Sequence, residues 1–170
     1  GFFAEPGAVP LDPPARARRI EYIGDSLSVG YGNTSPRRTC TPEEVHDTTD
    51  TTRAFGPVLA RRLDADYRVN AFSGFGIVRN YAGGVPDLSL PAIYPRMIPG
   101  DLEPREPAAD GWRPQLIVVN LGSNDFSTPL RSEERWPGPD ALRRDYRVRY
   151  VDFVRGLMER QPQARFILMG

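Results

Sequence analysis

The sequence predicts an α/β fold built around a parallel sheet, and three observations support this prediction. Four short apolar runs rich in β-branched and aromatic residues are separated by longer segments. Two of these segments carry apolar residues at helical spacing. The third apolar run is continuous, as expected of a central parallel strand that is covered on both faces. Strands that alternate with helices favour parallel pairing with right-handed crossovers.

The four predicted strands are short and are spread over the whole chain. They lie at residues 19–24, 67–74, 114–122 and 164–170. The first reads RIEYIG, and the third reads PQLIVVNLG, the most continuous apolar run. We therefore expect the third strand near the centre of the sheet.

Two helices are predicted between the strands, at residues 51–65 and 138–162. The first follows threonines that can cap a helix, and its apolar stripe is Phe55, Val58, Leu59 and Leu63. The stripe of the second is Leu142, Tyr146, Tyr150, Phe153, Val154, Leu157 and Met158, and Pro162 is expected to end that helix. Residues 82–113 are Pro-rich, with weak helical character around residues 90–97, and predict a long excursion.

Composition excludes several classes of protein. The 170 residues carry a formal net charge of zero, so no overall charge draws the chain to nucleic acid or to a membrane. Its apolar runs are too short to span a bilayer, and residues 1–10 do not resemble a signal peptide. Cys40 is the single cysteine and has no metal-ligand companions, and there is no Gly-rich phosphate loop. We therefore expect no metal and no cofactor.

Small polar clusters follow three of the predicted strands. Residues 24–26 read Gly-Asp-Ser, residues 73–76 read Ser-Gly-Phe-Gly, and residues 122–125 read Gly-Ser-Asn-Asp. Such residues are common in turns and helix caps, which is the alternative interpretation of each cluster alone. The carboxyl ends of parallel strands, however, form the ligand crevice of an open α/β sheet. Three clusters at successive strand ends therefore predict one site.

The residue types at these strand ends fit acyl transfer. Ser26 can present its hydroxyl as a nucleophile, with its own backbone N–H facing the same place. Gly74 has no side chain, so its N–H can approach a substrate closely. With the Asn124 amide, these donors would form an oxyanion hole for a tetrahedral intermediate. Asp25 and Asp125 are expected to hold the loops by accepting backbone hydrogen bonds.

These clusters resemble the first three blocks of the SGNH (GDSL) hydrolase superfamily. The longer stretches RRIEYIGDSLSVGYGN, SGFGIVRNYAGG and WRPQLIVVNLGSNDFS resemble carbohydrate esterase family 2. The resemblance implies a three-layer α/β/α sandwich of flavodoxin-like topology, with strand order 2-1-3-4. It also implies a serine esterase that removes acetyl groups from xylan-type polysaccharides or glycosides through an acyl-enzyme on Ser26. The family's setting implies an extracellular or periplasmic location.

The resemblance also implies parts that the sequence does not contain. In the family a β-sandwich domain precedes the hydrolase domain, so residues 1–18 are interpreted as a linker or the end of that domain, and residues 19–170 as the hydrolase domain. The fourth superfamily block, Asp-x-x-His, supplies the histidine base and is expected beyond Gly170, with the last strand and helix. His46 is the sole histidine, and we expect it to be structural or solvated.

Three side chains near the predicted site have two interpretations each. Trp136 could stack on a sugar ring, or it could seal the long helix. Arg79 and Asn80 could contact sugar hydroxyls, although bracing of a long loop is the preferred interpretation. Two other functions remain open for the whole chain: a non-catalytic carbohydrate-binding relative, and a lipase or thioesterase acting on acyl chains. The last would need an apolar channel, whereas the expected crevice rim is rich in polar residues.

Overall fold

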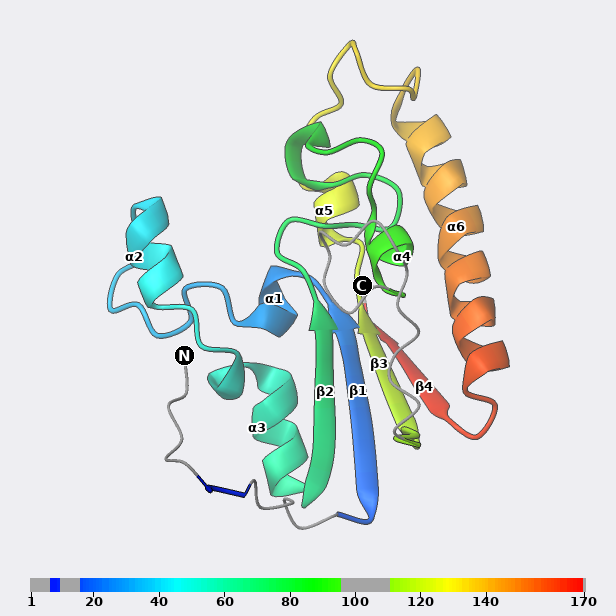
Figure 1. The fold of residues 1–170 in the computed structure, drawn as a ribbon. Coiled ribbons are helices and arrows are strands. Elements are labelled where there is room, and N and C mark those ends of the chain that lie inside the picture. Colours follow the sequence, from blue (N-terminus) through cyan, green and yellow to red (C-terminus); the bar gives the residue numbers. More distant parts are fainter. Residues whose placement is uncertain (1–6, 10–15, 96–110, 170) are drawn as a thin grey trace.

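The computed structural model describes residues 7–9, 16–95 and 111–169, and these contain one parallel sheet. Its strands are β1 (Arg18–Gly24), β2 (Ala65–Ala71), β3 (Leu116–Asn120) and β4 (Arg165–Met169). They pair in the order β2-β1-β3-β4, and every pairing is parallel (Figure 1). The predicted strand order is therefore confirmed.

The register of the sheet brings the carboxyl ends of three strands to one level. Gly24 at the end of β1 aligns with Ala71 of β2 on one side and with Asn120 of β3 on the other. The short helix α1 (Ser26–Val29), the 3-10 helix η2 (Tyr81–Gly83) and the short helix α5 (Ser123–Phe126) lie beyond these ends (Figure 1). The three polar clusters of the sequence therefore meet at one edge of the sheet.

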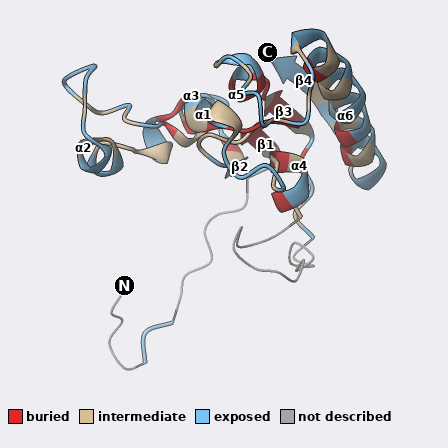
Figure 2. Cartoon of the chain, turned by 90° about the horizontal axis from the view of Figure 1, so that it is seen from above, coloured by how far each residue is buried: buried red, intermediate tan, exposed pale blue. Residues whose placement is uncertain are grey.

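Helices cover both faces of the sheet. Successive strand residues point to opposite sides, so apolar strand residues face the helices on each side. Ile20 and Tyr22 pack with Ala60 of α3 (Phe55–Arg62). Ile23 packs in a second cluster on the other face. That cluster includes residues of α4 (Leu90–Ile93) and of the long helix α6 (Pro139–Arg160). The view from above shows α3 and α4 on opposite faces (Figure 2). The described residues thus form the three layers that the sequence predicts.

Helix α3 buries a different face from the one that the apolar spacing predicts. Phe55 and Leu59 of the predicted stripe are 36% and 42% exposed, whereas Gly56, Pro57 and Ala60 are buried. A Cβ added to Gly56 would lie 2.8 Å from the Tyr22 ring, so the helix backbone lies directly on that ring. Small residues thus face the sheet because they let the helix approach it closely. The expected threonine cap is also wrong, since the N-cap residue has no side-chain hydrogen bond.

Helix α6 agrees better with its predicted stripe. Leu142, Phe153 and Leu157 are buried, and the helix ends at Arg160, before Pro162. Met158 is 51% exposed and does not belong to the buried face. The apolar stripe therefore identified the packed side of this helix except at its carboxyl end.

Two further segments complete the described fold. Residues 30–54 leave the sheet and carry α2 (Pro42–Asp47), which begins with a capping box between Thr41 and Glu44. The predicted helix around residues 90–97 is observed as α4, and its last part lies outside the described residues, as does most of the predicted linker 1–18. Among the described helices, none has the length and apolar character needed to cross a membrane.

Candidate active site

Ser26 is the first residue of α1 and is separated from the end of β1 only by Asp25. It is partly exposed, and its hydroxyl has no hydrogen-bond partner within the described ranges. Its backbone N–H belongs to the first turn of the helix, where no helical carbonyl can accept it. The strand-to-helix junction thus leaves both the hydroxyl and the N–H of Ser26 available to a ligand.

The carboxylate of Asp25 joins the two neighbouring strand ends. Asp25 is 1% exposed and caps α1 by accepting the Leu27 N–H at 3.1 Å. Its second oxygen accepts the Ser123 hydroxyl at 2.5 Å and the Asn124 amide at 3.2 Å. Asp25 therefore fixes α1 relative to α5. Sequence reasoning did not single out Ser123, although its place in Gly-Ser-Asn-Asp beside Asn124 was a usable signal.

Asn124 lies between the loops that follow β1 and β2. It is 7% exposed, and its Nδ2 donates to the Phe75 carbonyl at 2.9 Å as well as to Asp25. The two acceptors orient the amide from opposite loops. Both hydrogens of the Asn124 amide therefore have acceptors, and the bond to Asp25 is the longer of the two.

Gly74 occupies a turn that only a flexible backbone adopts readily. The Phe75 N–H closes this turn onto the Phe72 carbonyl at 3.2 Å, and Gly74 has a φ of +83°. A positive φ at the third position of a turn favours glycine. The Gly74 carbonyl accepts the Tyr81 N–H at 2.8 Å, and its own N–H has no partner among residues that the structure describes. This N–H is thus available as a second backbone donor.

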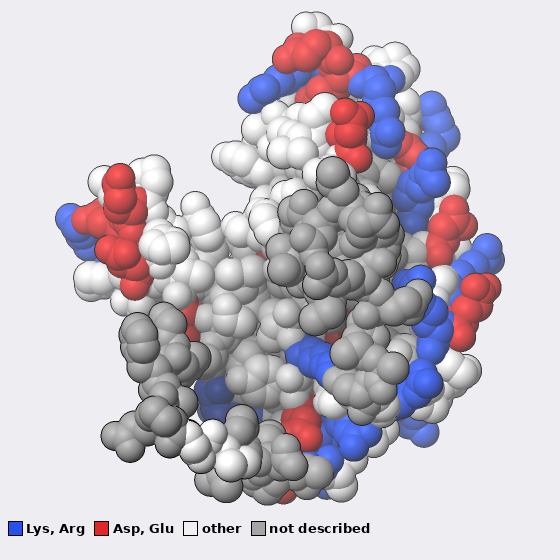
Figure 3. Space-filling model, viewed as in Figure 1, with Lys and Arg blue, Asp and Glu red and all other residues white. Residues whose placement is uncertain are grey.

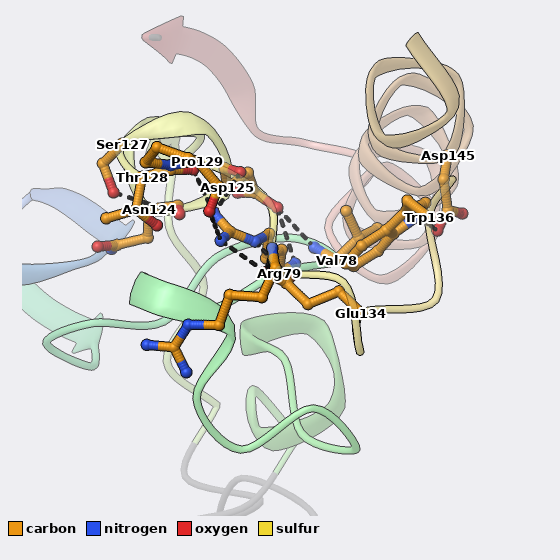
Figure 4. Close-up of polar contacts among 11 residues, drawn as sticks. Val78, Arg79, Asn124, Asp125, Ser127, Thr128, Pro129, Glu134, Trp136 and Asp145 are labelled. Atoms are coloured by element: carbon orange, nitrogen blue, oxygen red, sulfur yellow. Dashed lines mark hydrogen bonds and ion pairs between the residues drawn. The ribbon is translucent and has the colours of Figure 1, made fainter. Parts of the chain in front are cut away.

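The buried carboxylate of Asp125 holds the loop that follows Gly74. Asp125 is 0% exposed and accepts the backbone N–H groups of Ile77, Val78 and Arg79 at 3.0, 2.8 and 3.0 Å. Figure 4 shows Asp125 with Val78 and Arg79. Burial raises the pKa of the Asp125 carboxyl, and the three N–H bonds oppose this rise. A Cβ on Gly76 would lie 2.5 Å from the Asp125 carboxylate. This is the geometry expected of a loop-holding aspartate.

Arg79 and Asn80 use their polar atoms inside the protein. Arg79 is 2% exposed, and its guanidinium binds Glu134 and the carbonyls of Thr128 and Pro129. Asn80 is 5% exposed; its Oδ1 accepts the Gly76 N–H, and its Nδ2 donates to two backbone carbonyls. The contacts support the bracing interpretation. The preferred interpretation therefore holds for both residues, and the alternative of contact with sugar hydroxyls is not supported, because their polar groups are bound inside the protein.

Trp136 packs beside the long helix. Its indole N–H donates to Asp145 of α6 at 2.9 Å (Figure 4). The Arg135 guanidinium lies 4.4 Å from the ring centroid. The ring also packs against the buried cluster under α6. These contacts favour the packing interpretation over the sugar-stacking one.

His46 lies on α2, away from the strand ends that carry the candidate site (Figure 1). Its side chain is exposed. In the part of the chain that the structure describes, no group of three or more His, Cys, Asp or Glu could hold a metal ion.

The space-filling view shows a hollow between the segment of α2 and the segment of α5 and η2, with mostly uncharged atoms facing it (Figure 3).

A serine at a strand-to-helix junction, with free backbone donors and an oriented amide on the loops at the same edge of the sheet, is typical of a hydrolase that transfers acyl groups. The comparison with protein families agrees with this class. The chain belongs to the GDSL-like lipase/acylhydrolase family, whose model matches residues 22–170.

Similar proteins include esterases that act on carbohydrates. An acetylxylan esterase / glucomannan deacetylase of Cellvibrio japonicus is 52% identical over 172 residues, covering 100% of this chain and 47% of that protein. A solved carbohydrate esterase, described as having divergent catalytic and non-catalytic binding functions, is 51% identical with a TM-score of 0.89. The match covers 99% of this chain and 50% of that one.

A second solved structure extends the likeness. The carbohydrate esterase family 2 enzyme of Corynascus thermopiles (Myceliophthora fergusii), solved with a carbohydrate binding domain, is 36% identical with a TM-score of 0.74. That match covers 94% of this chain and 46% of the other. The chain thus spans about half the length of these relatives.

Proposed function

We propose that this chain is the catalytic part of a serine esterase that removes acetyl groups from carbohydrates such as xylan or glucomannan. The observation that carries the proposal is the Ser26 hydroxyl without a partner among the described residues, next in sequence to Asp25, which binds the Asn124 amide, in a chain 52% identical to a relative with that name. We infer an extracellular or periplasmic location from the class of substrate. We also propose that residues 1–18 join the hydrolase domain to an upstream β-sandwich domain.

The proposed reaction proceeds through an acyl-enzyme. The Ser26 oxygen attacks the acetyl carbonyl while a base takes its proton, and the carbonyl oxygen becomes an oxyanion. The N–H groups of Ser26 and Gly74 and the Asn124 amide stabilise that oxyanion. Collapse breaks the ester bond, and the protonated base gives its proton to the leaving sugar oxygen. Water then attacks the acetyl-serine in the same manner and releases acetate.

We assign the base to a histidine in an Asp-x-x-His context that lies outside residues 1–170, because His46 is exposed on α2 away from the strand ends. The exposed apolar side chains next to the candidate groups would contact the acetyl methyl and the sugar face. Leu27 is 62% exposed, Phe72 39% and Phe126 45%. Each follows or precedes one of the three polar clusters in sequence.

The test compares Ser26→Ala with wild type in the full-length protein, measuring acetate release from acetylated xylan and from an aryl acetate. We expect Ser26→Ala to abolish both activities and leave Tm nearly unchanged, because a partly exposed hydroxyl without partners contributes little packing. Asn124→Ala should lower kcat by roughly 10²–10³, as loss of one oxyanion donor does elsewhere. Turnover retained by Ser26→Ala would end the esterase assignment.

A second candidate function is carbohydrate binding without catalysis, and the printed description of the solved relative with a TM-score of 0.89 raises it. In that case wild type would bind xylo-oligosaccharides and release no acetate.

The His46→Ala variant is the matched control for the assignment of the catalytic base. It should keep wild-type turnover, and loss of turnover would place the base on α2.

A further inference from the structure

The proposed mechanism does not use the ion pair between Arg79 and Glu134, which is the most buried pair in the described part of the chain. The Arg79 side chain is 1% exposed and that of Glu134 is 8% exposed. The contact is bidentate: Arg79 Nε lies 2.6 Å from one Glu134 oxygen, and Nη2 lies 2.9 Å from the other (Figure 4). Two buried charges are costly unless they are fully paired. Removal of either residue would therefore leave the charge of the other buried without a partner.

The guanidinium also binds three backbone carbonyls of the segment after β3. Nη1 donates to the carbonyls of Asp125 and Thr128 at 3.3 and 3.1 Å, and Nη2 donates to Pro129 at 3.0 Å. Glu134 in turn accepts the Arg131 N–H at 2.9 Å, which closes its own loop. One side chain from the loop after β2 thus fixes the course of residues 125–134.

The two loops joined in this way carry two of the candidate oxyanion donors. Gly74 belongs to the loop after β2, whose ends are tied by the Tyr81 N–H to Gly74 carbonyl bond at 2.8 Å. Asn124 belongs to α5, next to Asp125, and bonds the Phe75 carbonyl across the gap. Any shift between the loops would change the distance between the Gly74 N–H and the Asn124 amide.

We propose that Arg79 and Glu134 are positioning residues for acyl transfer, which set the Gly74 N–H and the Asn124 amide at the separation that the oxyanion requires. The proposal rests on the proposed esterase function and adds to it a pair of residues that does not touch substrate. Small misplacements of such groups cost large factors in rate, because donors must meet the oxyanion at hydrogen-bond distance.

A positioning role has a kinetic signature that a sugar-binding role lacks. The oxyanion forms in acylation and again in deacylation, whichever alcohol leaves. Loss of positioning should therefore lower kcat by the same factor on acetylated xylo-oligosaccharide and on an aryl acetate, with KM for each changed little. A role in sugar recognition would instead act on the oligosaccharide alone.

The experiment uses full-length wild type and four variants, with Tm and xylo-oligosaccharide affinity measured beside kcat and KM. Glu134→Ala should lower kcat roughly 10- to 100-fold on both substrates. Glu134→Gln keeps one acceptor oxygen and should recover part of that loss. Arg79→Lys should not recover activity, because an ammonium cannot reproduce the planar fork that serves Glu134 and the carbonyls. Arg143→Ala, which breaks an exposed pair with Asp140, is the control and should leave kcat unchanged.

The outcomes separate the alternatives. Unchanged kcat in folded Glu134→Ala, or a loss confined to the oligosaccharide, would overturn the positioning role. The positioning role would also be overturned if kcat fell only by the same factor as the fraction of protein that still binds xylo-oligosaccharide. If Glu134→Ala does not fold, the Glu134→Gln and Arg79→Lys variants carry the comparison. No acetate release by wild type on either substrate would overturn the proposed function itself.

Discussion

Replacement of Asp125 should show how much of the stability depends on one buried carboxylate. Asp125→Ala would leave the N–H groups of Ile77, Val78 and Arg79 without their acceptors in a site that is 0% exposed. Each buried group without a partner costs about 1–3 kcal/mol, so three cost roughly 3–6 kcal/mol if water entering the space satisfies some of them. Each kcal/mol lowers Tm by about 2–4 °C in a domain of this size. The expected fall in Tm is therefore about 6–24 °C.

Asp125→Asn gives the intermediate case. Its amide oxygen can take the place of Oδ1, which accepts Val78 and Arg79, but its NH₂ group would then face the Ile77 N–H. We expect a loss of about 1–3 kcal/mol, from one unpaired donor. Thermal and urea unfolding measure whether stability falls from wild type to Asp125→Asn to Asp125→Ala. The exposed Asp140→Ala variant is the control. Equal stability of wild type and Asp125→Asn, or of the two variants, would refute the hydrogen-bond reasoning.

Two further predictions concern the same loops. Arg79 lowers the pKa of Glu134, so the stability that this ion pair contributes is present above about pH 4.3 and is lost as pH falls through the lowered pKa. The difference in unfolding free energy between wild type and Glu134→Gln should therefore narrow on acidification, and a constant difference would contradict this. Gly76→Ala should destabilise the fold, because its Cβ would lie 2.2 Å from the Arg79 carbonyl, whereas Gly138→Ala meets no atom within 4 Å. Similar Tm values for the two alanine variants would show that the loop can relax.

The sequence predicts the sheet well because its signals are local. Each strand is a contiguous apolar run, and the resemblance implied the order that the structure has. The gathering of residues 24–26, 73–76 and 122–125 at one edge follows from parallel pairing alone. The position of Ser26 at a strand-to-helix junction follows from the same pattern, since Asp25 directly after a strand is a natural helix cap.

The errors concern contacts that composition cannot express. Apolar spacing placed Phe55 and Leu59 against the sheet, whereas the space above Tyr22 admits only the backbone of Gly56. Bracing by Arg79 could be expected from the sequence, but its partner Glu134, 55 residues further along the chain, could not. Such partners depend on how two loops fold over each other, and no periodicity in the sequence records that.

The alignment of Gly24 with Ala71 and Asn120 has a consequence for the order of events in folding. The candidate groups leave three different strands, so none can cooperate before β1 has paired with both neighbours. These pairings join distant parts of the chain and form more slowly than local helices. In the full-length protein, reactivity of Ser26 toward a serine-directed reagent should therefore appear during refolding only after the helical circular dichroism signal has formed.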